Sequence, residues 1–170
     1  YSGRFSTGNV WGTSTRATSA GSRPTEAQKA SLSRMVAERS AKRWPQEVAI
    51  DHAERPRMLS ELMRAVGAEP VPNPLASRCC GSYHTVDKKD AVARRVGEIV
   101  DCARGRGADA LVLSCPLCYF NLDRRQEGEG MPVLYFTQLL ALAMGREEEC
   151  GFDQHRVDPR PLLRERGLMR

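Results

Sequence analysis

The sequence predicts an α/β fold, in which a mainly parallel sheet is flanked by helices and follows a poorly ordered N-terminal segment. Two observations lead to this class. From about residue 56 onwards, segments whose apolar residues recur at helical spacing alternate with short apolar runs. The clearest of those runs, residues 110–113, is apolar on both faces, which is typical of parallel strands covered by helices on both sides.

The N-terminal segment has a composition of its own. Residues 1–25 are rich in Ser, Thr and Gly without apolar periodicity, so we expect a loose tail; a weak helix is expected over 26–43. The formal net charge of +5 resides in the first 48 residues. No basic run interleaves with aromatic residues, so nucleic-acid binding is not expected. We divide the chain into residues 1–46, a cysteine-rich domain at 47–146 and a C-terminal extension at 147–170.

The first helix of the domain is expected over residues 56–66, because Leu59, Leu62 and Met63 share one face. A short extended piece at 68–71 and a proline-rich loop then lead to Cys79. The longest helix is expected over 87–104, where a regular apolar stripe runs until glycine ends the pattern.

The second half continues the alternation. A buried strand is expected at 110–113, followed by a helix over 116–125 and a second strand at 133–136. Thr137 is the expected N-cap of a helix over 138–144. A short final helix opens at Asp158-Pro159-Arg160-Pro161.

Four of the six cysteines fall into two pairs, Cys79-Cys80-Gly81 and Cys115-Pro116-Leu117-Cys118. Loops that follow parallel strands collect on one edge of a sheet, so the two pairs are expected to meet there. Thiolates bind soft metals, and adjacent cysteines suit a cluster of several irons better than one tetrahedral ion. We assign Cys102 to the core and Cys150 to a position without a ligand role.

Metal ligation is favoured over a disulfide framework. A disulfide between adjacent Cys79 and Cys80 would be strained, and residues 1–20 lack the apolar stretch of a signal peptide. No run of eighteen apolar residues is present, so membrane insertion is not expected. These features predict a cytoplasmic location, where thiols stay reduced.

The cysteine motifs resemble a known family. Cys79-Cys80-Gly81 followed by residues 115–123 (CPLCYFNLD) is similar to the CCG cysteine-rich domain. Residues 132–140 (PVLYFTQLL) and 157–163 (VDPRPLL) narrow the resemblance to the C-terminal half of the B subunit of heterodisulfide reductase, the CoB–CoM heterodisulfide reductase family. The resemblance covers about two-thirds of the chain.

That resemblance implies an iron–sulfur redox subunit. In the family, five thiolates hold a noncubane 4Fe-4S cluster, with two such domains per chain, and the cluster cleaves a disulfide substrate in two one-electron steps. Electrons arrive through a ferredoxin-like C subunit together with a flavin-containing A subunit. For this chain the resemblance implies Cys79, Cys80, Cys115 and Cys118 as ligands, in an oxidoreductase subunit that is inactive as an isolated chain.

The sequence departs from the family in two respects: one CCG domain is present, and no cysteine precedes Cys79. One hypothesis explains both departures, namely that residues 1–46 derive from a shifted reading frame or were joined from elsewhere. Gly-Cys-Leu-type codons in another frame near residues 35–45 of the coding DNA would support it, and their absence would exclude it. Two alternatives stay open: an electron-relay subunit of a lactate- or glycolate-oxidising complex, and a non-catalytic zinc or metal-free remnant of the domain.

Five other polar residues are weaker candidates for the site. His84 follows the first pair closely but is interpreted as a surface-loop histidine, and His52 and His155 are expected to be solvated. Asn121 and Asp123 follow the second pair at helical spacing and are expected to orient the local backbone.

Overall fold

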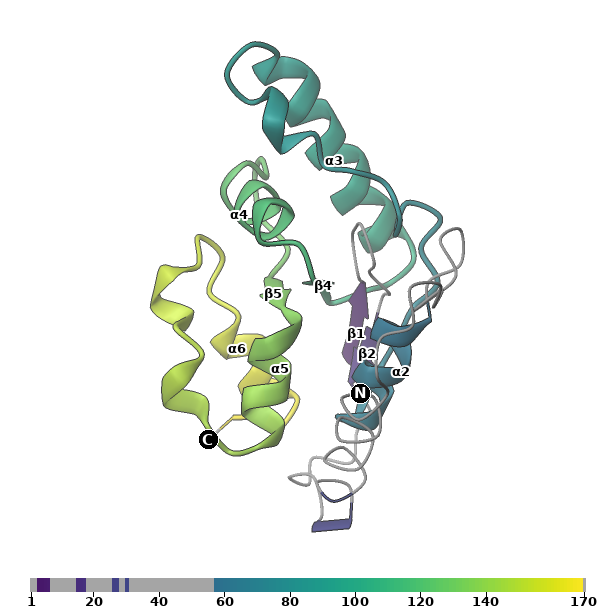
Figure 1. Ribbon diagram of the computed structural model, residues 1–170, viewed down its shortest axis with the longest axis vertical. Helices are drawn as coiled ribbons and strands as arrows, with labels where there is room; N and C mark the ends of the chain where they lie inside the picture. The colour runs from purple at the N-terminus through teal and green to yellow at the C-terminus, as the bar shows by residue number, and fades with distance from the viewer. Residues whose placement is uncertain (1–2, 7–14, 18–25, 28–29, 31–56, 170) are drawn as a thin grey trace, which may run out of the picture.

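A computed structural model describes residues 3–6, 15–17, 26–27, 30 and 57–169 (Figure 1). The expectations for His52, for most of the helix over 26–43 and for the region of the absent upstream cysteine lie outside these residues; residues 26, 27 and 30 are helical. The strands are β1 (Gly3–Ser6), β2 (Thr15–Ala17), β3 (Ala68–Glu69), β4 (Ala110–Leu113) and β5 (Val133–Tyr135). The helices are α2 (Met58–Ala65), α3 (Lys89–Gly105), α4 (Pro116–Arg124), α5 (Phe136–Ala143) and α6 (Arg160–Glu165), with short 3₁₀ turns η1 (Ser82–His84), η2 (Glu147–Glu149) and η3 (Phe152–Gln154).

The five described strands form one sheet in the order β3-β2-β1-β4-β5. β1, β4 and β5 are parallel neighbours, whereas β2 pairs antiparallel with both β1 and β3. Two successive reversals return β3 to the direction of β4, so only β2 runs the opposite way. The predicted α/β class with a mainly parallel sheet is therefore confirmed.

Two strands lie where the composition predicted no regular structure. β1 and β2 come from the segment rich in Ser, Thr and Gly, and they join β3 to β4. Their backbone hydrogen bonds require no apolar alternation, so the side-chain pattern did not indicate them.

The two faces of the sheet carry separate cores, because successive strand residues point to opposite sides. On one face, Ala110 and Val112 of β4 pack with α2, α5 and α6. On the other face, Leu111 and Leu113 pack with α3 and α4. Figure 1 shows α3 and α4 on one side of β4 and β5, with α5 and α6 below them.

The helices begin and end close to their expected positions, with one correction. Thr137 is not the N-cap of α5, because the helix already begins at Phe136. The side chain of Gln138 instead accepts the backbone N–H of Tyr135 at 2.8 Å, which satisfies a donor at the helix start. Within the described residues, no helix combines the length and the hydropathy needed to cross a bilayer.

The segment 147–169, assigned above to a C-terminal extension, contributes buried residues to the same core. Cys150, Phe152 and Leu163 are buried in the cluster formed by α2, α5 and the sheet. The core beside α5 is therefore completed by residues beyond 146.

Replacing Gly130 by alanine is expected to lower the free energy of unfolding by about 1–3 kcal/mol. A Cβ at this position would lie 2.4 Å from Cγ2 of Val157 and 3.2 Å from Nη2 of Arg156, so the Val157 side chain must move. Gly97 is the matched control: it lies within α3, and its Cβ would meet nothing within 4 Å. Gly97→Ala should stabilise the chain by up to about 1 kcal/mol through helix propensity. Urea unfolding measures the free energy of unfolding of both variants. Equal changes in the two variants would contradict the prediction.

Candidate metal centre

The fold brings both cysteine pairs to one edge of the sheet. Cys115 occupies the N-cap position of α4, two residues after β4 ends, and Pro116 is the first helical residue. Cys79 and Cys80 end the loop after β3, which runs in the same direction as β4. Parallel strands end at a common edge, so the expected meeting of the two loops occurs.

Cys80 and Cys118 form the closest contact of the site. Their Sγ atoms are 3.0 Å apart, and both side chains are buried between α3 and α4. The Asn121 side chain donates from Nδ2 to the Cys80 carbonyl at 3.3 Å, while its Oδ1 is buried without a partner. Asn121 thus fixes the backbone of the first pair to the helix of the second, a long-range contact and not the local one expected.

The two buried thiols share one hydrogen bond, which gives them different pKa values. The hydrogen bond between the two sulfurs lowers the pKa of Cys80 to about 6 in spite of burial. The same hydrogen bond, together with burial, raises the pKa of Cys118. One thiolate in this pair is already present near neutral pH, and a thiolate is the form that binds metal.

The other two cysteines are closer to solvent. Cys79 is exposed, and its Sγ accepts the N–H of Gly81 at 3.4 Å; Cys115 is half-buried beside the Cys80–Cys118 pair. In the part of the chain that is described, no three His, Cys, Asp or Glu side chains converge on one point. The donor chemistry fits an iron–sulfur group, since the four thiols are free and come from the loop after β3 and the start of α4, but their sulfurs are not gathered around a common centre.

Gly81 has a backbone conformation that favours glycine. Its φ of +75° lies in the left-handed region, which side chains rarely adopt. A Cβ would meet only Cγ2 of Val92, at 3.9 Å, which is an ordinary contact. The glycine therefore sets the turn into η1.

The remaining cysteines lie away from the two pairs. Cys102 is half-buried on α3, where its Sγ donates to Oδ1 of Asn73 at 3.3 Å. Cys150 is buried in the core on the opposite face of the sheet, beside α5. His84 lies in the loop after the first pair, with Nδ1 3.5 Å from the carboxylate of Asp87.

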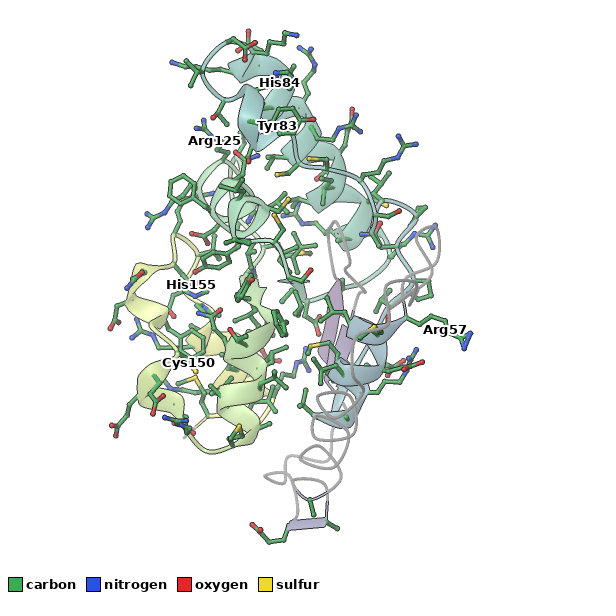
Figure 2. The ribbon with its side chains drawn as sticks, in the orientation of Figure 1. Arg57, Tyr83, His84, Arg125, Cys150 and His155 are labelled. Carbon is green, nitrogen blue, oxygen red and sulfur yellow. The ribbon has the colours of Figure 1, made fainter. Side chains whose placement is uncertain are left out.

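His155 is not solvated, contrary to expectation. It is buried against Tyr119 and Phe152, whose ring centroids lie 5.3 and 5.6 Å away (Figure 2). Its Nε2 lies 2.9 Å from Nε2 of Gln138. Because Oε1 of Gln138 accepts the Tyr135 N–H, the Gln138 nitrogen is the donor and the histidine nitrogen accepts. Burial lowers the pKa of His155 and favours this neutral form.

Acidification is expected to destabilise the chain through His155. Its pKa in the folded state lies below the ordinary value, so the unfolded chain binds this proton more readily. The contribution to stability is therefore complete above about pH 6.5 and declines as the pH falls towards the folded pKa, by at most about 1.4 kcal/mol per pH unit. Urea unfolding from pH 7.5 to 5 should show a steeper loss in wild type than in His155→Asn. His84→Asn, whose side chain is 43% exposed, is the control and should follow wild type.

Two further surface features were not indicated by any sequence motif. A cleft of about 390 Å³ lies between α3 and residues 125–127, and no cysteine lines it. It is lined by three arginines, Arg94, Arg104 and Arg125, and three acidic residues, so it carries no net charge. Large apolar side chains are exposed beside the cysteine pairs. The spacing of apolar residues in the sequence does not indicate which of them the fold leaves exposed.

The matches to known proteins fall on the same part of the chain as the two cysteine pairs. The family of the CCG cysteine-rich domain matches residues 45–123, a range that includes both cysteine pairs. The chain is 29% identical over 123 residues to the B subunit of the ferredoxin/F(420)H(2)-dependent CoB-CoM heterodisulfide reductase of Methanosarcina acetivorans, covering 64% of this chain and 40% of that protein. It is 31% identical over 115 residues to the B subunit of the ferredoxin:CoB-CoM heterodisulfide reductase of Methanosarcina mazei, covering 61% and 38%.

A third relative has a different name. The "8-methylmenaquinol:fumarate reductase membrane anchor subunit" of Wolinella succinogenes is 27% identical over 121 residues, covering 66% of this chain and 43% of that protein. The chain spans about two-fifths of the length of each of these curated relatives. Residues 45–123 match the model of the CCG cysteine-rich domain, and over that region the chain is similar to the B subunits of heterodisulfide reductases.

Proposed function

We propose that this chain is an iron–sulfur redox subunit of a heterodisulfide reductase-like complex and that Cys79, Cys80, Cys115 and Cys118 are its ligands. The observation that carries the proposal is the buried contact between Cys80 and Cys118, 3.0 Å apart, within a matched CCG domain. Two soft donors, one from the loop after β3 and one from α4, meet in a water-poor pocket, which favours thiolate–metal bonding.

The group we propose is a 4Fe-4S cluster of the noncubane type, which supplies one-electron chemistry for reducing a disulfide or a related sulfur substrate. The residues of this chain perform the supporting tasks. Cys80 provides a thiolate near neutral pH, Asn121 fixes its backbone, and apolar residues of α3 and α4 exclude water.

The electron donors, the location and the domain bounds of the chain belong to the same proposal. A ferredoxin-like C subunit together with a flavin-containing A subunit would deliver electrons in the cytoplasm, and the chain would be inactive without them. The proposed CCG unit covers residues 47–146, with β1 and β2 of segment 1–46 in its sheet and 147–170 as a C-terminal extension packed on its core.

A second candidate is an electron-relay subunit, as in lactate- or glycolate-oxidising complexes. The observation that favours it is the Wolinella succinogenes relative, whose name refers to fumarate reductase and menaquinol rather than to a disulfide. In this alternative the same cysteines hold a cluster that passes electrons on without binding a sulfur substrate.

Anaerobic reconstitution of the full chain with iron and sulfide tests both candidates. The first predicts about four irons per chain and, after oxidation, an electron paramagnetic resonance spectrum that differs from that of a cubane cluster. A conventional cubane spectrum would favour the relay. One zinc per chain without visible absorption would instead indicate the non-catalytic remnant and would exclude both redox functions.

A further inference from the structure

Cys80 and Cys118 are arranged as a reactive dithiol, apart from any role as metal ligands. Their Sγ atoms lie 3.0 Å from each other, about 1 Å farther apart than two bonded sulfurs. Both cysteines are free, and their side chains are 0% and 1% exposed. A disulfide between them therefore requires only a small movement of two sulfurs that are already in contact.

The fold holds the two sulfurs together through elements that are far apart in sequence. Cys80 ends the loop after β3, Cys118 lies in the first turn of α4, and the two positions are 38 residues apart. Asn121 donates from Nδ2 to the Cys80 carbonyl at 3.3 Å, which anchors the loop on α4. Both thiols are packed in the apolar cluster of α3 and α4. Groups held in contact in this way react with each other as if each were present at a very high concentration.

The other pairings of the cysteines are less favourable. Cys79 and Cys80 are adjacent, so a disulfide between them would be strained. Cys79 is exposed and Cys115 is half-buried, whereas Cys118 is buried in contact with Cys80. Cys150, labelled in Figure 2, belongs to the core on the opposite face of the sheet. The arrangement therefore favours the pairing of Cys80 with Cys118.

We propose that, in the metal-free chain, Cys80 and Cys118 reduce a small-molecule disulfide, R–S–S–R, by thiol–disulfide exchange and become a disulfide themselves. One of the two protein thiolates attacks a sulfur of the small disulfide, forms a mixed disulfide and releases one R–S⁻. The second protein thiol attacks the protein sulfur of that mixed disulfide, closes the Cys80–Cys118 bond and releases the second R–S⁻. The protons of the two protein thiols end on the two released thiols, and the small disulfide gains the two electrons that the cysteines lose.

The two neighbouring thiols give a small disulfide access to the buried pair. Cys79 is exposed and Cys115 is half-buried, so either one meets the small disulfide first. Exchange between thiols conserves the number of disulfides, and the bond therefore passes inward to the pair that is already in contact. Cys79 and Cys115 affect the rate of the reaction and not its final product.

The disulfide and the proposed cluster exclude each other. A sulfur that is bonded to a second sulfur has no thiolate to offer to iron. This exclusion rests on the proposed function, whereas the reduction of a small disulfide requires no iron.

Peptide mapping of the full chain tests the proposal. The chain is freed of metal with a chelator, reduced with a phosphine, and incubated without oxygen with bis(2-hydroxyethyl) disulfide until the release of 2-mercaptoethanol stops. The remaining thiols are then alkylated, and the tryptic peptides are identified by mass spectrometry. The expected product joins the peptide of residues 79–88 to the peptide of residues 107–124, with the loss of two hydrogen atoms.

Two matched pairs of variants identify the sulfurs in that product. Cys79→Ser and Cys115→Ser should each retain the bridge between the two peptides. Cys80→Ser and Cys118→Ser should each reduce its yield about tenfold or more, because the thiols that remain are not held in contact. Circular dichroism establishes that each variant is folded, and the wild-type map decides the question where a variant is not.

Two results would overturn the proposal. One is a wild-type disulfide confined to residues 107–124, which would join Cys115 to Cys118. The other is a wild type in which Cys80 remains available to the alkylating reagent. Reconstitution with iron and sulfide separates this proposal from the proposed function: a chain that forms the bridge but binds no iron after reduction refutes only the function, and a chain that binds iron but forms no bridge refutes only the dithiol activity.

Discussion

Replacing Asp123 by alanine is expected to lower the free energy of unfolding by about 3 kcal/mol, which corresponds to about 10 °C in Tm. The carboxylate is buried at the end of α4, where its oxygens accept the backbone N–H groups of Arg156, at 2.7 Å, and Val157, at 3.5 Å. Alanine would leave both amides without this acceptor, and a buried donor without a partner carries its full desolvation cost.

Two companion variants identify the cause of that loss. Asp123→Asn retains one carbonyl oxygen and should lose about half as much stability. Asp153→Ala removes an exposed carboxylate that pairs with Arg160 at 2.6 Å, and it should stay within about 0.5 kcal/mol of wild type. Urea denaturation monitored by circular dichroism measures all three. An Asp123→Ala loss no larger than that of Asp153→Ala would show that the C-terminal segment is held by other contacts.

Replacing Cys118 by serine is expected to reduce iron incorporation to about a tenth of wild type or less, because even residues outside a metal's ligand shell change affinity 10–100-fold. A hydroxyl at this position is a poor ligand for iron in a sulfur-rich group. Cys80→Ser should have a comparable effect, because the two Sγ atoms are in contact. Iron and acid-labile sulfide per chain, measured after anaerobic reconstitution, give the result.

Cys102→Ser is the control for this loss. Cys102 is half-buried on α3 and donates to Asn73, a bond that a serine hydroxyl can also make. Iron content should remain that of wild type. Equal loss in Cys102→Ser and Cys118→Ser would mean that serine disturbs the fold, and unchanged iron in Cys118→Ser would remove the Cys80–Cys118 pair from the proposed ligands.

Regular periodicity over long segments made parts of the fold predictable. The apolar stripe of α3 is buried as expected because seventeen helical residues repeat one pattern: Val92, Val96, Ile99, Val100 and Ala103. The short run 110–113 is buried on both faces as expected because all four of its residues are apolar. The edge shared by the cysteine pairs followed from strand direction, which depends on topology and not on side-chain detail.

What could not be predicted depends on contacts between residues far apart in sequence. The burial of His155 requires Gln138 and Tyr119, neither of which stands near it in sequence. The role of Asp123 requires the amides of residues 156 and 157. Spacing places four thiols in two loops but does not fix where each sulfur points, so the burial of Cys80 beside the exposed Cys79 required the structure.

The packing of Leu163 and Phe152 beneath α5 also governs the order of events during synthesis. The nascent chain emerges from the ribosome with α2, β4, β5 and α5 first, and domains fold as units once their contacting parts are available. The face of the sheet beneath α5 stays open to water until translation has passed Leu163. A ribosome that pauses between residues 146 and 163 therefore holds a chain whose cysteine motifs are already synthesised but whose core is incomplete. We expect chaperone binding and aggregation at this stage.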